Sequence, residues 1–98
     1  MARVSRGGEP PEAALARVLD GEGRLLSWPR RPAVRLAALR HLAARLDPEA
    51  VLTEREVTAR LAGGLRCLDP VTLRRELVDA GLLSRDPRGR AYRVTPAG

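Results

Sequence analysis

The sequence predicts a mainly α fold with a small β-hairpin, arranged as a winged helix-turn-helix: a three-helix bundle plus a wing, preceded by a short N-terminal helix. Three observations support this prediction. Apolar residues recur at three- and four-residue spacing between residues 32 and 46, as on the buried side of a helix. Two helix start signals follow, at Thr53 and Asp69. A hairpin turn, residues 86–89, then separates two short strand-like segments.

Length and composition indicate one globular domain. The chain has 98 residues, of which 44% are hydrophobic and 31% charged. We expect residues 1–8 to be disordered, residues 9–23 to form a short helix and turn, and residues 24–98 to form the winged-helix domain. No segment approaches the roughly 20 apolar residues that cross a bilayer. The N-terminus lacks the apolar region of a secretory signal, so we expect a cytoplasmic protein without membrane contact.

The N-terminal half should contain two helices. Pro10 and Pro11 open a helix over residues 12–19, and the sequence Asp-Gly-Glu-Gly at residues 20–23 stops it. Residues 24–28 are expected to be extended. A long helix then begins at Pro32 and runs to about residue 46. Its apolar stripe consists of Leu36, Leu39, Leu42, Ala43 and Leu46.

The next two helices form the helix-turn-helix. Thr53 and Glu56 make a capping box for a helix that extends to about residue 62, after a short connector at residues 51–52. Two glycines at residues 63–64 form the turn. Asp69 is the N-cap of the last helix, with a proline at its first helical position.

The C-terminal part should close the fold with a wing. The last helix ends at residue 80, with Gly81 in the left-handed conformation that commonly ends helices. Residues 82–85 and 91–95 are the expected strands, joined by the Asp-Pro-Arg-Gly turn at residues 86–89.

Four stretches of this sequence resemble the bacterial domain-of-unknown-function family numbered two thousand and eighty-seven. They are Leu25–Pro29, Arg35–Ala43, Thr53–Val57 and Thr72–Leu83, and the resemblance covers residues 23–94. Members of this family often carry a transcriptional-regulator label, so the resemblance implies a winged helix but no particular biochemical activity. The members usually have an aromatic residue at the positions of His41 and Ala80, so the core here should be built from smaller side chains.

Positive charge is distributed unevenly along the chain. All 18 basic residues are arginines, and Lys, Ile, Asn, Phe and Gln are absent, so part of the charge reflects a GC-rich codon bias. Residues 24–46 contain six arginines and no acidic residue, and residues 82–98 contain four arginines and one aspartate. Residues 47–81, which include the helix-turn-helix, contain five arginines against seven acidic residues. The basic surface is therefore expected before the first long helix and on the wing. The last helix, which is the recognition helix of a helix-turn-helix, is expected to act more as a structural support.

This pattern favours double-stranded DNA as the partner. A wing lying along the DNA backbone would contact phosphates, with Arg88 near or in the minor groove. Arg75 is the candidate for a major-groove contact, and Thr72 could join it. The alternative for the arginine-rich segments is a solvated face with no ligand. The DNA-contact candidates are Arg30, Arg31, Thr72, Arg75, Arg85, Arg88, Arg90 and Arg93.

Two further arginines fall on the core-facing sides of their helices. These are Arg35 and Arg74. A buried guanidinium needs a carboxylate partner. We therefore expect structural ion pairs in which Glu56 or Asp79 supplies the carboxylate, with direct base or phosphate contact as the alternative.

The sequence argues against an enzyme. It has one histidine and one cysteine, which are too few for a Cys/His metal cluster, and no Gly-rich phosphate loop after a strand, so we expect neither metal nor cofactor. His41 is expected to be a plain surface residue. Cys67 is expected to be a small buried hydrophobe, the alternative being a thiol sensor tuned by Arg66.

Two functions remain open at this level. The first is a DNA-binding transcriptional regulator that contacts phosphates mainly through its basic wing. The second is a protein-interaction or oligomerisation module, forming a homodimer or binding a protein partner through the N-terminal helix around Leu15 and Leu19.

Overall fold

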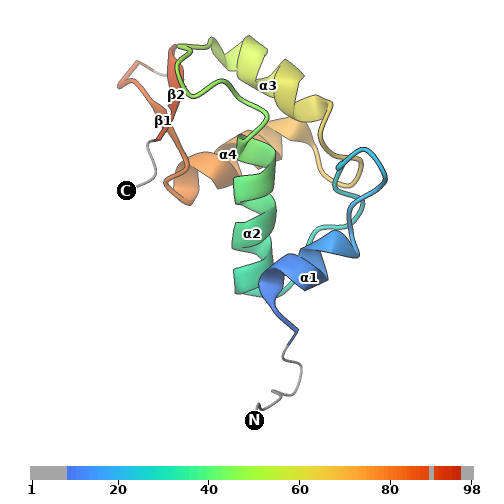
Figure 1. Cartoon of the computed structure of the whole chain (residues 1–98). Helices are drawn as coiled ribbons and strands as arrows, with labels where there is room; N and C mark the ends of the chain where they lie inside the picture. The colour runs from blue at the N-terminus through green and yellow to red at the C-terminus, as the bar shows by residue number, and fades with distance from the viewer. Residues whose placement is uncertain (1–8, 89, 96–98) are drawn as a thin grey trace.

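The computed structural model describes residues 9–88 and 90–95. In this part of the chain, four helices precede one antiparallel hairpin, the winged-helix-like arrangement that the sequence predicts (Figure 1). Residues 1–8, expected to be disordered, and Gly89 of the expected turn lie outside the described residues. None of the helices described is both long and apolar enough to cross a membrane. The elements are α1 (Pro11–Ala16), α2 (Pro32–Ala43), α3 (Glu54–Ala62), α4 (Pro70–Asp79), β1 (Leu83–Arg85) and β2 (Tyr92–Val94).

The predicted helix caps of α3 and α4 are confirmed. The Thr53 hydroxyl accepts a hydrogen bond from the Glu56 N–H (3.1 Å), and the Glu56 carboxylate accepts one from the Thr53 N–H (2.8 Å). The Asp69 carboxylate accepts a hydrogen bond from the Thr72 N–H (3.2 Å). After α4, Gly81 adopts a φ of +79°, a left-handed conformation that glycine adopts without steric cost. Local side-chain chemistry therefore sets the limits of the helix-turn-helix.

The two N-terminal helices are shorter than predicted. α1 ends at Ala16, and α2 ends at Ala43. Beyond α2 the chain makes tighter bonds of the i to i−3 type, from the Arg45 N–H to the Leu42 carbonyl and from the Leu46 N–H to the Ala43 carbonyl. Leu46 is nevertheless buried, so the predicted apolar stripe continues past the end of the regular helix.

The expected connector between α2 and α3 takes part in the sheet. The Leu52 N–H donates to the Tyr92 carbonyl (2.9 Å), and the Tyr92 N–H donates to the Leu52 carbonyl (2.7 Å). This antiparallel bridge fixes β2 to the start of the helix-turn-helix. The hairpin is therefore held from two sides, by its own turn and by the segment before α3.

The register of the hairpin determines where its side chains point. Ser84 pairs with Arg93, and Arg85 pairs with Tyr92. Because side chains alternate across a strand, Arg85 and Tyr92 share the face that carries the buried Leu83. Arg93 lies on the opposite, exposed face with Ser84.

The core includes the short N-terminal helix. Leu15 of α1 is buried in the same hydrophobic cluster as residues of α2, α3, α4 and the hairpin. Figure 1 shows α1 lying across one end of α2. Leu19 packs against the same cluster and forms a bridge to Leu25. The apolar side of the N-terminal helix is therefore used within this chain.

An extended segment at Leu25 ties the N-terminal part to the turn between α3 and α4. The Leu25 N–H donates to the Gly64 carbonyl (2.9 Å), and the Leu25 carbonyl accepts from the Arg66 N–H (2.8 Å). Gly64 is buried, and a Cβ at this position would lie 2.5 Å from Cδ of Arg45 and 3.1 Å from a methyl group of Leu42. The absence of a side chain lets α2 approach the turn closely.

The expectation of a plain surface histidine at His41 is wrong. The side chain is half-buried, and its Nε2 lies 2.7 Å from the carbonyl oxygen of Gly23. Gly23 has a φ of +78°, which turns the chain back toward α2. The imidazole therefore fastens the loop after α1 to α2.

Candidate nucleic-acid interface

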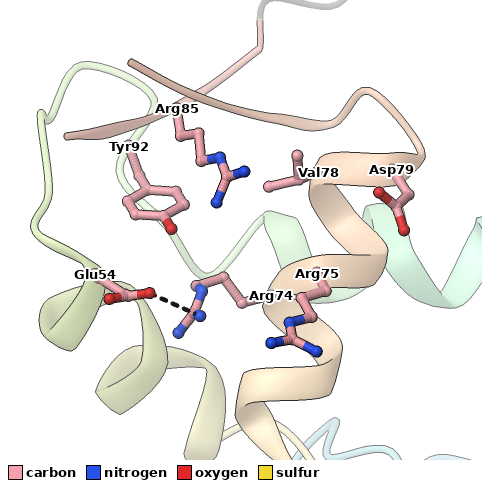
Figure 2. Close-up of a pocket in the computed structure, with 7 residues that line it drawn as sticks. All are labelled: Glu54, Arg74, Arg75, Val78, Asp79, Arg85 and Tyr92. Carbon is pink, nitrogen blue, oxygen red and sulfur yellow. Dashed lines mark ion pairs between the residues drawn. The ribbon is translucent and has the colours of Figure 1, made fainter. Parts of the chain in front are cut away.

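A polar cleft opens between α4 and the hairpin (Figure 2). Its volume is about 380 Å³. Three arginines and two carboxylates line it, which leaves one formal positive charge. The lining residues are Glu54, Arg74, Arg75, Val78, Asp79, Arg85 and Tyr92.

Arg74 forms the floor of this cleft and is 9% exposed. Its Nη2 lies 2.8 Å from the carboxylate of Glu54, and its Nη1 donates to the Thr58 hydroxyl at 2.8 Å. The guanidinium carbon also lies 5.8 Å from the centre of the Tyr92 ring. One side chain of α4 therefore contacts both α3 and β2.

The carboxylate that pairs with Arg74 is neither of the two expected ones. Glu56 uses its carboxylate in the capping box, and the hydrogen bonds from the backbone and side chain of Thr53 lower the pKa of Glu56. Glu54 and Thr58 lie one helical turn apart and so share the face of α3 that meets α4. Asp79 lines the cleft but is exposed and, within the described residues, forms no ion pair.

Arg75 and Arg85 face the cleft, and no described carboxylate pairs with either of them. Both side chains are exposed, and neither forms an ion pair or hydrogen bond with the residues that the structure describes. Figure 2 shows Arg85 entering from the hairpin and Arg75 lying on the α4 edge. Their guanidinium donors are therefore open to a ligand.

The other wing arginines do not join this cleft. Arg88 and Arg90 lie beside the turn and are exposed. The Asp86 carboxylate accepts hydrogen bonds from the Arg90 N–H (2.8 Å) and the Ala91 N–H (3.4 Å), which shapes the turn. Arg93 points away on the outer face of the hairpin. The predicted wing surface is therefore divided into an inner side, a tip and an outer side.

Arg30 and Arg31 lie far from the wing. They precede α2, whose 12 residues span about 18 Å. Val94 of β2 lines a pocket together with Arg40 and Ala43, which lie at the opposite, C-terminal end of that helix. Both Nη atoms of Arg31 donate to the Glu9 carbonyl at 3.4 Å. These two arginines therefore form no continuous surface with the hairpin, contrary to the single working surface expected from the charge pattern.

Arg35 differs from its expected role as well. It forms no ion pair with the residues that the structure describes, and donates from Nε to the Pro29 carbonyl (3.2 Å) and from Nη2 to the Arg30 carbonyl (3.4 Å). Its guanidinium carbon lies 5.6 Å from the centre of the Trp28 ring. Because the side chain is only half-buried, carbonyl groups and an aromatic face are sufficient partners.

The remaining candidates are occupied or unreactive. The Thr72 hydroxyl donates to the Asp69 carboxylate at 3.3 Å, so it supports the cap of α4. Cys67 is half-buried, and burial raises the pKa of its thiol, the opposite of what a thiolate sensor needs. The described residues bring no group of three or more His, Cys, Asp or Glu side chains together in a way that could hold a metal ion.

Three residues that organise this cleft are not among the site residues predicted from the sequence: Glu54, Thr58 and Tyr92. The four-residue spacing of Glu54 and Thr58 was a usable signal, because it puts both on one side of α3. Tyr92 carried no such signal. Its role follows from its pairing with Leu52 and Arg85.

Comparison with known proteins identifies a family. Residues 24–94, which span α2, α3, α4 and the hairpin, match the family described as "Uncharacterized protein conserved in bacteria (DUF2087)". Curated proteins and solved structures gave no match. α1 lies outside the matched range. The chain therefore belongs to the DUF2087 family of uncharacterized bacterial proteins.

Proposed function

We propose that this domain binds duplex DNA through the cleft between α4 and the hairpin, and that it serves as the DNA-binding part of a transcriptional regulator. The observation that carries this proposal is the position of Arg75 and Arg85. They stand on two facing elements of a winged-helix-like frame, exposed and without carboxylate partners among the described residues.

Phosphate is the ligand that suits these side chains. A guanidinium presents several N–H donors in a planar fork, which matches the oxygens of a phosphate group. Electrostatic attraction to phosphates supplies much of the affinity of DNA-binding proteins. Arg88 and Arg90, which are exposed beside the turn, add positive charge to the hairpin outside the cleft. Backbone contact by the wing, rather than base reading by α4, is therefore the proposed mode of binding.

A binding role is preferred over catalysis. The one histidine contacts the Gly23 carbonyl, and burial raises the pKa of the Cys67 thiol, which disfavours the thiolate that nucleophilic chemistry needs. The protein-interaction alternative drew on the acidic helix-turn-helix and on the apolar side of the N-terminal helix. Leu15 is buried and Leu19 is partly buried against the core of this chain, so the second of these two observations no longer favours it.

Fluorescence anisotropy with a labelled random-sequence duplex tests the proposal. We expect binding that weakens as salt rises, because each phosphate contact contributes about 0.9 to the slope of log affinity against log salt. Arg75→Glu and Arg85→Glu should each lower the affinity at low salt by about ten-fold or more, since each loses a charged hydrogen bond.

Arg66→Glu is the matched control. It makes the same change in net charge at an exposed site in the turn between α3 and α4, away from the hairpin. A wild-type Kd above about 1 mM at low salt would rule the proposal out, because this affinity is lower than that of ordinary non-specific DNA binding. Equal losses in all three variants would show that only net charge matters, and not this cleft.

A further inference from the structure

Tyr92 has a buried phenolic hydroxyl at the wall of the cleft. The residue is 1% exposed, and both its backbone groups are bonded to Leu52. Its ring lies under the Arg74 guanidinium. Within the described residues the phenolic hydroxyl has no hydrogen-bond partner, and Figure 2 shows it directed into the cleft. A buried polar group without a partner costs stability, so the cleft presents a donor that a ligand can satisfy.

Several other donors converge on the same space. Arg74 commits Nη1 and Nη2 to Thr58 and Glu54, but its Nε–H has no partner in the described part of the chain. Arg75 and Arg85 bring two further guanidinium groups. Donors therefore outnumber acceptors at the surface of the cleft, which selects for a ligand rich in acceptor oxygens.

The charge of the cleft restricts that ligand further. Glu54 is neutralised by Arg74, and Asp79 lies on the α4 edge of the cleft, one helical turn beyond Arg75. One net positive charge remains. A singly charged phosphodiester matches this balance, whereas a dianionic phosphate would meet the unpaired carboxylate of Asp79.

We propose that the cleft is a seat for one phosphodiester group, in which the Tyr92 hydroxyl donates to a phosphate oxygen between Arg75 and Arg85. If the ligand is DNA, the phosphodiester belongs to the DNA backbone, and the inference then rests on the proposed function. It makes Tyr92 a ligand-binding residue and fixes the position of one phosphate against the hairpin.

Tyr92→Phe tests this seat because it removes the hydroxyl and keeps the ring. We expect DNA affinity to fall about ten-fold, the loss of one hydrogen bond to a charged group. The salt dependence of binding should be unchanged, since no charge is removed. The thermal unfolding midpoint should not fall, because the hydroxyl has no partner among the described residues. Ser84→Ala, which removes a hydroxyl from the outer face of the hairpin, is the control and should bind as the wild type does.

A second measurement needs neither DNA nor a variant. Tyr92 is the single tyrosine of the chain, so its ring signals in a proton NMR spectrum identify it directly. Titration with dimethyl phosphate, a phosphodiester monoanion, should shift these signals saturably. Sodium chloride at equal ionic strength should not, and inorganic phosphate at neutral pH should bind more weakly.

The outcomes separate the two proposals. Wild-type affinity in Tyr92→Phe, alongside losses in Arg75→Glu and Arg85→Glu, overturns the seat and leaves DNA binding in place. If the wild type binds no DNA but dimethyl phosphate shifts the Tyr92 signals, the seat stands and its source is another phosphodiester. If dimethyl phosphate causes no more shift than sodium chloride does, the seat is refuted.

Discussion

The guanidinium of Arg74 lies 2.8 Å from the carboxylate of Glu54, and it is the link through which α4 holds the start of α3. The same guanidinium faces the Tyr92 ring, so α3, α4 and the hairpin meet at one side chain. The cleft proposed to bind DNA is built on this junction. Its geometry should therefore depend on Arg74 more than on the exposed arginines around it.

Arg74→Met should destabilise the fold by about 1–3 kcal/mol, because it removes the bonds to Glu54 and Thr58 from a buried position while keeping an apolar stem. Urea unfolding followed by circular dichroism measures this change. Arg75→Met is the matched control at the neighbouring exposed position and should stay within about 0.5 kcal/mol of the wild type. Equal effects of the two substitutions would contradict the structural role of Arg74.

Gly64→Ala should destabilise the protein by about 1–3 kcal/mol, the usual cost of forcing an extra group into a packed site. Its methyl group would lie 2.5 Å from Cδ of Arg45 and 3.1 Å from Leu42, so at least one of these side chains must move. A thermal unfolding scan checks the prediction. Gly21→Ala has open space around the new methyl group and should leave the midpoint unchanged. A neutral Gly64→Ala would show that the approach of α2 to the turn is loose.

Asp20 should make the free energy of unfolding depend on pH in the acidic range. Its carboxylate accepts hydrogen bonds from the Arg24 backbone and side chain and from the Glu22 N–H, and these lower its pKa from 3.8 to about 2. A carboxyl group whose pKa is lower in the folded than in the unfolded protein stabilises the fold at pH values above its unfolded-state pKa. This stabilisation is lost as the pH falls through the folded-state pKa. The advantage of the wild type over Asp20→Asn should thus shrink between about pH 4 and pH 2. Thermal melts across this range measure it, and a constant difference would argue against the pKa shift.

The bridge between Leu52 and Tyr92 should protect both amide protons from exchange. Each N–H is bonded to the other residue's carbonyl, at 2.9 and 2.7 Å. The neighbouring Val51 is exposed, and its N–H has no backbone acceptor among the described residues. In native-state hydrogen exchange, Leu52 and Tyr92 should exchange much more slowly than Val51. Comparable rates at the three amides would mean that the hairpin is not fastened to the segment before α3.

Local signals made most of the fold predictable. Thr53, Asp69 and Gly81 act on their own helix ends, so their effects can be read from neighbouring residues. The partner of Arg74 could not be read in this way. Glu54 and Glu56 are two residues apart and so point about 200° apart around α3, and only the packing of α3 on α4 decides which one Arg74 meets.

The arrangement of the site was harder to predict than its residues. Arg85 and Arg93 look equivalent in the sequence, but the register of the hairpin places them on opposite faces. Arg30 carries the same charge as the wing arginines, yet α2 separates it from the hairpin. Composition reports how much charge there is, whereas long-range packing determines which charges share a surface.

The most direct test of the central claim is a map of NMR chemical shifts during titration with duplex DNA, read at the backbone amides and at the Arg Nε–H signals. We expect the largest changes at Arg75, Arg85 and the hairpin, with little change at Arg30 and Arg31 before α2. Changes centred on Arg30 and Arg31, or no change at the cleft when DNA is in excess, would contradict the assignment of this surface.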